Sequence, residues 1–430
     1  DCFGGFTNMG QNQHVPIING FTADGKNITL IDCHLTNSNL SMPGFVTVTY
    51  SPRIIVIGKQ YKTIEEIKLI EISTRYNNFE EWFNVNAFKT AYDSQNNLYV
   101  NCSTPQKLIW KVADEEVEIR FSTVFNTNGF NEASIYQKQI VAFKFNQPVD
   151  FESAIRSKVS DFGNFLTLCI GVRVLPYDLR GKDIEGTEIE FLYHSLKDDE
   201  VNQKKNQFYV YYTDLESDFE RYLNMWSEKS KQIEPILGYF VDAHDKTFDN
   251  PMSFIKITQA LEAFSRRMRN NEDLPTELHE ERVRKILDSI TDQGYKSWLS
   301  TLMQYSNEPR LRKRLVELFK ETNYVFNISN DNRKNMINKI VNTRNYFTHF
   351  DKEKEHEIMG LNELFYVSIY MKFVLRALIM KELGISHELI AERLNEESEL
   401  RTTMEGLKLE EPAKLFDVRV VPRQSTSASE

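Results

Sequence analysis

The segment Ile337–Asp351, INKIVNTRNYFTHFD, places an arginine within the apolar stripe of an expected helix. Ile337, Ile340 and Val341 follow the three- and four-residue steps that bring side chains onto one helix face. The next step leads to Arg344, where a leucine would be typical. A charged group that faces a core needs a partner or a function. It is either paired with a buried carboxylate or emerging at the bundle edge, or it is kept for chemistry.

His349 follows Arg344 by five residues, which is about 140° around a straight α-helix. The two side chains therefore diverge unless the helix frays or turns between them, and the polar run that follows predicts a helix end at 347–350. A guanidinium offers a fork of donors suited to phosphate, and an imidazole can transfer protons at neutral pH. Together they are equipped for phosphodiester cleavage. An arginine and a histidine at this spacing often occur by chance. The prediction of phosphodiester cleavage therefore depends on the position of Arg344 in the apolar stripe.

From about residue 214 onward, apolar residues recur with helical spacing, which predicts an all-α bundle. The longest apolar run, 361–380, is interrupted by Glu363, Lys372 and Arg376. A membrane span carries few or no charges, so we expect a buried central helix there. Expected helices cover 214–241, 251–269, 276–290, 309–323, 332–347, 361–380 and 386–400.

Up to about residue 212 the chain predicts strands, because runs rich in Val, Ile, Phe and Tyr alternate with polar residues between Asn, Gly, Asp and Pro. In one of these runs Val117 and Ile119 point one way while Glu118 and Arg120 point the other, which predicts a sheet with one solvated face. The pattern fits a β-sandwich or a single curled sheet. Expected strands cover 27–35, 44–58, 65–73, 106–112, 116–125 and 137–145, with helical insertions at 77–85 and 151–168.

The expected fold class is α+β and multidomain. A β-rich, sandwich-like N-terminal domain covers 1–212, an all-α helical domain covers 213–400, and a partly disordered tail covers 401–430. The net charge of −10 argues against a surface that binds nucleic acid throughout, but it leaves room for a basic patch. Residues 246–350 hold 18 Lys or Arg against 13 Asp or Glu, so this stretch is locally basic. Such runs are also compatible with solvated helix faces.

Cysteine usage and missing motifs limit the chemistry further. The four cysteines lie far apart and form no Cys-x2-Cys pair, so we expect neither a zinc site nor a redox motif. No GxxxxGK[ST] loop indicates an NTPase. We expect no cofactor, no membrane span and a cytoplasmic location. The chain begins with Asp1 and carries no recognisable signal peptide, so we expect the true start to be missing.

The hexapeptide Arg344–His349, RNYFTH, in an all-α bundle resembles the Arg-polar-x3-His motif of HEPN domains. The residue after the arginine is commonly Asn, Asp or His in that superfamily, and here it is Asn345. The wider segment 337–351 resembles the form found in ApeA-type HEPN proteins of bacterial anti-phage defence. FIKITQALEAFSRRM, at 254–268, resembles an early helix of that group. The β-rich half, with NITLIDC and FEEWF, resembles the ApeA N-terminal domain.

This resemblance implies a metal-independent endoribonuclease in which two motifs of a homodimer, or of a higher homo-oligomer, face one composite site. His349 would be the general acid/base at the 2′-hydroxyl and the leaving oxygen, and Arg344 would stabilise the transition state. Asn345 would orient the backbone or the scissile phosphate. The products would be 2′,3′-cyclic phosphate and 5′-hydroxyl ends. Glu262 would support Arg344, unless it is an exposed helical carboxylate. Tyr346 and Phe347 would stack on bases, unless they belong to the bundle core.

The internal 2′-hydroxyl nucleophile agrees with the expected absence of a metal. The main hypothesis is an abortive-infection effector that cleaves RNA and is switched by a phage-derived trigger at the N-terminal domain. The alternative is a non-catalytic HEPN module that dimerises or binds RNA or protein, with a ligand-recognition surface on the β domain. A hydrolase site in the N-terminal half is disfavoured, because His14, His34 and His194 accompany no GxSxG or HExxH motif there.

Overall fold

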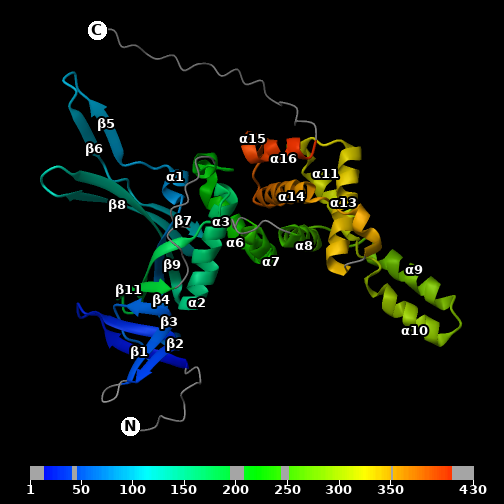
Figure 1. Ribbon diagram of the computed structural model, residues 1–430, viewed down its shortest axis with the longest axis horizontal. Helices are drawn as coiled ribbons and strands as arrows, with labels where there is room; N and C mark the ends of the chain where they lie inside the picture. Colours follow the sequence, from blue (N-terminus) through cyan, green and yellow to red (C-terminus); the bar gives the residue numbers. More distant parts are fainter. Residues whose placement is uncertain (1–13, 41–45, 194–207, 244–250, 350–351, 409–430) are drawn as a thin grey trace. The chain divides into compact units, whose positions relative to one another are not determined.

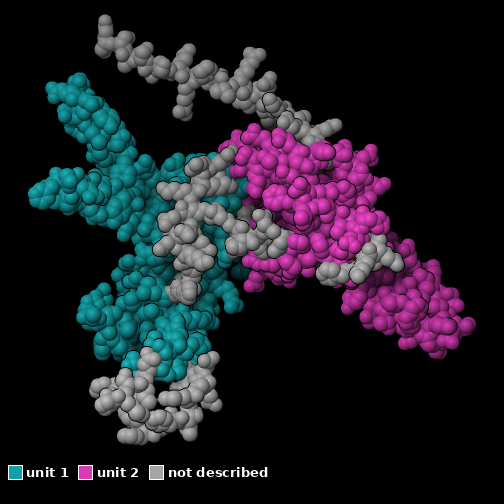
Figure 2. Space-filling view, in the orientation of Figure 1, with its two compact units in different colours: residues 1–231 teal, residues 232–430 magenta. Residues whose placement is uncertain are grey.

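The computed structural model describes residues 14–40, 46–193, 208–243, 251–349 and 352–408. The chain divides into two compact units, Asp1–Lys231 and Gln232–Glu430, which Figure 2 colours separately. The first unit is β-rich and the second is helical, so the predicted fold class is confirmed.

The first unit is built on an antiparallel sheet of nine strands in the order β1-β2-β3-β11-β10-β4-β9-β8-β7, and β5 and β6 form a separate two-stranded sheet (Figure 1). The main strands therefore belong to one sheet, the second of the two arrangements that the pattern allowed. The strands are β1 (His14–Phe21), β2 (Asn27–Leu40), β3 (Val46–Ile57), β4 (Lys68–Tyr76), β5 (Phe88–Tyr92), β6 (Leu98–Cys102), β7 (Leu108–Val112), β8 (Glu115–Thr127), β9 (Ala133–Asp150), β10 (Pro176–Asp183) and β11 (Glu188–Tyr193).

Two helical segments pack on this sheet at the two predicted insertions. The first is α1 (Phe79–Phe83). The second is a continuous run of α2 (Phe151–Ala154), the π-helical η3 (Ile155–Ser160) and α3 (Asp161–Ile170). The Asp150 side chain begins this run by accepting a hydrogen bond from the Ser153 N–H at 2.8 Å. A short 3₁₀ turn, η2 (Ile64–Glu66), precedes β4.

The first compact unit extends past residue 212, where the sequence period changes, because aromatic residues from α5 (Tyr212–Leu215) and α6 (Phe219–Gln232) complete its core. The rings of Tyr212 and Phe219 lie 5.9 and 6.2 Å from that of Trp82. The Trp82 indole donates to the Val210 carbonyl at 2.7 Å. The 3₁₀ turn η4 (Glu216–Asp218) joins α5 to α6.

The prediction of a solvated face on β8 is wrong at Glu118, whose exposed fraction is only 1%. Glu118 accepts hydrogen bonds from Arg120 Nε at 2.8 Å and from Lys144. Arg120 also forms two 2.7 Å hydrogen bonds with the Glu71 carboxylate on neighbouring β4. The polar residues of the strand thus face a network of paired charges that excludes water from Glu118. We call Glu71, Glu118, Arg120 and Lys144 the sheet charge cluster.

The second unit is a bundle around α14 (Leu361–Glu382), which the sequence predicts as a buried central helix. Helices α8, α11, α15 and α16 pack against it, and α13 packs against α8 and α11. The other helices are α7 (Glu234–Asp242), α8 (Pro251–Met268), α9 (Thr276–Asp288), α10 (Gln293–Leu302), α11 (Leu311–Glu321), α12 (Asn323–Phe326), α13 (Asn330–His349), α15 (His387–Glu396) and α16 (Ser398–Gly406), with 3₁₀ turns η5 (Met303–Tyr305) and η6 (Lys352–Glu357).

Two sequence expectations for the helical region need correction. The single helix expected at 214–241 is divided into α5, α6 and α7. Pro235 lies in the first turn of α7, where its missing N–H is tolerated, and it cannot continue α6. Helix α10 was not expected at all, although it forms a hairpin with α9 that projects from the second unit (Figure 1).

The expected tail at 401–430 begins inside α16, which extends to Gly406, and residues 409–430 lie outside the described part of the chain. Within the described ranges, every helix is too short or too polar to cross a membrane.

Candidate active site

Helix α13 presents its buried face through Met336, Ile337, Ile340 and Thr343. The buried stripe therefore continues from Ile340 by a three-residue step to Thr343, and the expectation that Arg344 occupies the middle of the stripe is wrong. The Thr343 hydroxyl accepts a hydrogen bond from the Met359 N–H at 3.0 Å, which satisfies both groups inside the bundle. Arg344 lies at the border of this face, with 27% of its side chain exposed.

The Arg344 guanidinium is held by two long contacts. Its Nη2 lies 3.5 Å from Oε2 of Glu262 on α8, and its Nη1 lies 3.3 Å from Oδ1 of Asn345. Both distances are longer than typical hydrogen bonds between nitrogen and oxygen, so the arginine is oriented without being saturated. The structure thus brings together Arg344, Asn345 and Glu262 from a separation of 82 residues in the sequence.

Glu262 is itself anchored by a chain of charges that the sequence analysis missed. Arg266, one helical turn along α8, lies 3.4 Å from Glu262 and also pairs with Glu308. Glu308 lies 3.7 Å from the fully buried Arg314 of α11. Burial, followed by repulsion from Arg266, lowers the pKa of Arg314. We call Glu262, Arg266, Glu308 and Arg314 the support chain. Only its first link, Glu262 and Arg266 four residues apart, was readable from the sequence.

His349 is the last described residue of α13, and its side chain is exposed. Among the described residues, none forms a hydrogen bond or an ion pair with its imidazole. The helix does not fray between the two motif residues: it is α-helical from Arg344 through His349, and the Thr348 hydroxyl donates to the Arg344 carbonyl at 2.8 Å. The two side chains therefore leave one helix about 140° apart.

The two aromatic residues of the motif differ in their surroundings. The Phe347 ring lies 6.3 Å from that of buried Phe254 in an edge-on arrangement, so Phe347 helps to pack α13 on α8. The Tyr346 ring lies 5.8 Å from Phe347 and is half-buried. Tyr346 thus borders the site and presents part of its ring to solvent.

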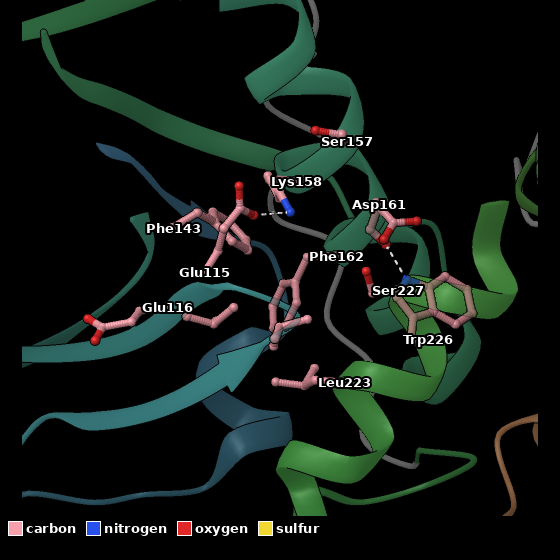
Figure 3. A pocket seen from close by; sticks show the side chains of 12 residues that line it. Glu115, Glu116, Phe143, Ser157, Lys158, Asp161, Phe162, Leu223, Trp226 and Ser227 are labelled. Atoms are coloured by element: carbon pink, nitrogen blue, oxygen red, sulfur yellow. Dashed lines mark hydrogen bonds and ion pairs between the residues drawn. The ribbon is translucent and has the colours of Figure 1, made fainter. Parts of the chain in front are cut away.

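The described part of the chain holds no group of three or more His, Cys, Asp or Glu residues arranged to bind a metal ion. A cavity of about 40 Å³ lies in the first unit between β8, η3 and α6 (Figure 3). It has room for a water molecule but not for a nucleotide. Asp161 lines it, and burial raises the pKa of that carboxyl to about 6, against the lowering effect of the Ser230 hydrogen bond.

A second charged group in the first unit joins residues from three strands. His14 Nε2 lies 2.5 Å from Asp32 Oδ1, and Arg53 Nε donates to Asp32 Oδ2 at 2.8 Å. The His14 hydrogen bond lowers the pKa of Asp32, burial opposes this shift, and the Arg53 hydrogen bond adds to the lowering. The rings of His14 and His34 are 5.1 Å apart, whereas His194 lies outside the described residues. The interactions found here are those of an ion-pair network, and they add no nucleophile to the disfavoured hydrolase hypothesis.

Comparison with protein-family models gives two matches that follow each other along the chain. ApeA N-terminal domain 1 matches residues 1–226, and Apea-like HEPN matches residues 255–389. The second match contains Glu262, Arg344 and His349. Searches of curated proteins and of solved structures find no match. With more than half of its length covered by the first model and its helical bundle by the second, the chain belongs to the ApeA family of HEPN domain proteins.

Proposed function

We propose that this protein is a metal-independent endoribonuclease and an effector of bacterial anti-phage, abortive-infection defence. HEPN domains are generally associated with ribonuclease activity. The observation that carries the proposal is an unsaturated arginine, oriented by Glu262 and Asn345, on the same helix end as an exposed histidine that is free of partners among the described residues.

The proposed reaction uses the 2′-hydroxyl of RNA as its nucleophile. An imidazole removes the 2′-hydroxyl proton, the 2′-oxygen attacks the adjacent phosphorus, and the bond from phosphorus to the 5′-oxygen breaks. A protonated imidazole donates its proton to that leaving oxygen. The products are a 2′,3′-cyclic phosphate and a 5′-hydroxyl. Arg344 stabilises the charge that develops on the phosphoryl oxygens, and Asn345 orients the scissile phosphate.

The divergence of Arg344 and His349 on one helix supports a composite site. A phosphate that contacts Arg344 cannot also contact the His349 imidazole of the same copy if the two side chains point about 140° apart. A second copy resolves this, because its His349 can approach the arginine of the first. The same arrangement supplies the base and the acid from two imidazoles. The proposed enzyme is therefore active as a homodimer or as a higher homo-oligomer.

The ApeA N-terminal domain is assigned the sensing role, in which a phage-derived trigger releases the nuclease. Supporting this, the β5–β6 and β8–β9 hairpins extend from the first unit (Figure 1) and carry exposed aromatic side chains suited to protein contacts. The most exposed of these are Tyr92, Tyr99, Phe125 and Phe130.

The decisive experiment incubates purified protein with total cellular RNA, with and without EDTA, comparing wild type with His349→Ala. We expect wild type alone to yield fragments whose 5′ ends accept phosphate from a polynucleotide kinase without prior dephosphorylation. Equal cleavage by His349→Ala, or cleavage that EDTA abolishes, would overturn the assignment. RNA binding without cleavage by wild type would favour the non-catalytic module.

A further inference from the structure

The hairpin of α9, α10 and η5 leaves large apolar side chains uncovered within the described residues. Neither α9 nor α10 contains a buried residue. Tyr295, Trp298, Leu302 and Tyr305 are 68, 62, 59 and 73% exposed. We call these four residues the α10 stripe. Solvent contact on this scale is costly for a soluble protein and is typical of a binding surface.

The spacing of the α10 stripe indicates what it fits. Its members follow one another by three, four and three residues, which is the spacing of the seam between helices that pack nearly parallel or antiparallel. Leu299 and Met303 lie about 100° around the helix from the centre of the stripe and are half-buried, and α10 packs against α9. Helix α10 therefore has two apolar edges, of which α9 uses one. The edge that α9 does not cover has the residue spacing expected for packing against another helix.

The whole hairpin has the composition of half a four-helix bundle. On α9 the residues Val283, Ile286 and Leu287 are only half-buried. Two antiparallel helices cannot enclose such residues by themselves, whereas two packed hairpins can. A second hairpin would cover the α10 stripe and would complete the burial of the α9 residues.

The charge pattern of α9 favours a second copy of this chain as the partner that covers the α10 stripe. The exposed charges of α9 change from acidic to basic along the helix: Glu277, Glu280 and Glu281, then Arg282, Arg284 and Lys285, with Asp288 as its last residue. Glu281 and Lys285 also pair with each other at 2.7 Å. Two copies of α9 that run antiparallel across a twofold axis place each acidic half against a basic half. The α10 stripe carries no charge, so like charges do not meet there. Residues 276–305 hold five acidic and four basic side chains, which disfavours RNA as the occupant.

We propose that a second copy of this chain covers the α10 stripe, so that two hairpins form an antiparallel four-helix bundle that holds the dimer together. The inference rests on the proposed function in one respect, which is that a composite site needs two copies. The hairpin is also joined to that site. Asn307 joins the segment that enters the hairpin to the segment that leaves it. Its carbonyl accepts a hydrogen bond from the Asp273 N–H at 2.8 Å, and its side chain forms hydrogen bonds with the Leu274 backbone at 2.9 and 3.0 Å. The next residue, Glu308, belongs to the support chain beneath Arg344.

The first test measures self-association of the full chain by sedimentation equilibrium, without RNA. Wild type should dimerise, and Trp298→Glu should raise the dimer Kd on the order of a hundredfold. The matched control is Ser300→Glu, which adds the same charge about 180° from the centre of the stripe and should leave Kd within about threefold. A monomeric wild type, which would leave the stripe to a different protein, overturns the proposal. So does a Trp298→Glu variant that dimerises as wild type does.

The second test separates pairing with a second copy from general stickiness. One variant carries Glu277→Lys, Glu280→Lys and Glu281→Lys, and the other carries Arg282→Glu, Arg284→Glu and Lys285→Glu. Each alone should lose dimerisation, because its α9 helices repel, and an equimolar mixture should regain it as a heterodimer. A mixture that stays monomeric overturns the antiparallel pairing.

Failure of this inference and failure of the proposed function give different results. His349→Ala should dimerise as wild type does, because His349 lies outside the hairpin. If wild type dimerises through the hairpin but does not cleave RNA, the four-helix interface is supported and the nuclease assignment is wrong. If wild type cleaves RNA and Trp298→Glu neither weakens the dimer nor changes cleavage, the nuclease assignment is supported and the four-helix interface is wrong.

Discussion

The sheet charge cluster and the end of α13 each hold an arginine beside at least one carboxylate, but the two arginines differ in how many of their hydrogen-bond donors are used. In the first, Arg120 makes a bidentate pair with Glu71 at 2.7 Å and a further hydrogen bond to Glu118 at 2.8 Å. In the second, the only polar contacts that the Arg344 guanidinium makes with described residues are at 3.3 and 3.5 Å, although its side chain is about as exposed as that of Arg120, 27% against 30%. The first arginine has little capacity left for a ligand, whereas the second keeps donors for one.

This is the difference we expect between charges that stabilise a fold and charges that serve the proposed reaction. A buried pair is stable only when each charge finds close partners, since burial without them is costly. A group that must bind a phosphate cannot already be satisfied by the protein. The support chain agrees with a group that binds a ligand. Arg266 pairs with Glu262 and so holds it in place, while Glu262 is the one described carboxylate that pairs with the Arg344 guanidinium.

The largest expected effect concerns Arg344→Ala. Because the guanidinium stabilises the transition state in the proposed reaction, RNA cleavage should fall about 10²- to 10³-fold. The melting temperature should change little, because Glu262 keeps Arg266 as a partner. Timed cleavage assays and thermal denaturation measure the two quantities. Lys339→Ala, an exposed cation on the same helix, is the control and should leave both unchanged.

Glu118→Gln tests the saturated side of the comparison. Breaking a buried ion pair leaves cations without a partner, so the free energy of unfolding should drop by about 3 kcal/mol. Hydrogen bonds from Lys144, Arg120 and Lys107 outweigh burial and lower the pKa of Glu118 to about 2. Its contribution is therefore full above the unfolded value of 4.5 and is lost as pH falls toward 2. Urea denaturation would measure this, with exposed Glu116→Gln as the control; equal stability of the two variants would contradict the comparison.

The effect of Glu262→Gln should lie between those of the two previous substitutions, because Glu262 contacts Arg344 but not the substrate in the proposed reaction. Weaker orientation of Arg344 should lower kcat roughly 10- to 100-fold and leave KM nearly unchanged. Glu262→Asp should recover part of the loss. Glu363→Gln removes a carboxylate that pairs with Lys339 of α13 at 2.6 Å and serves as the matched control. A loss in Glu363→Gln as large as that in Glu262→Gln would assign both effects to general packing of α13.

The smallest effect is expected at Asp161, a carboxylate buried mainly beside neutral groups. Burial raises its pKa to about 6 from 3.8, so its folded form favours the protonated state. The associated stability is present below pH 3.8 and is lost as pH rises through 6. Asp161→Asn should therefore raise the free energy of unfolding by about 1.5 kcal/mol at pH 8 and by nearly nothing at pH 4. Denaturation curves at the two pH values that show the same difference would exclude this explanation.

Much of the fold could be predicted from local patterns. The six expected strands and most expected helices formed, because alternation and 3.6-residue spacing reflect which face of an element is buried. Strand β10 was missed because PYDLRGKD contains Pro, Gly and Asp, which are depleted in strands. Helix α10 was missed because QGYKSWLSTL contains Gly, Ser and Thr, which are poor helix formers.

Within the site, the sequence alone predicted the two helices that carry Arg344 and Glu262, because neighbours within one helix are fixed by its geometry. The roles of Asn345 and Glu262 rest on the resemblance to HEPN domains and stay predictions. Only the tertiary structure decided that Arg344 lies at the border of the buried face, that Glu262 reaches it across 82 residues, and that the α10 stripe is uncovered. These facts depend on how whole elements pack. A side chain's long-range partners are set by the bundle and not by its sequence neighbours.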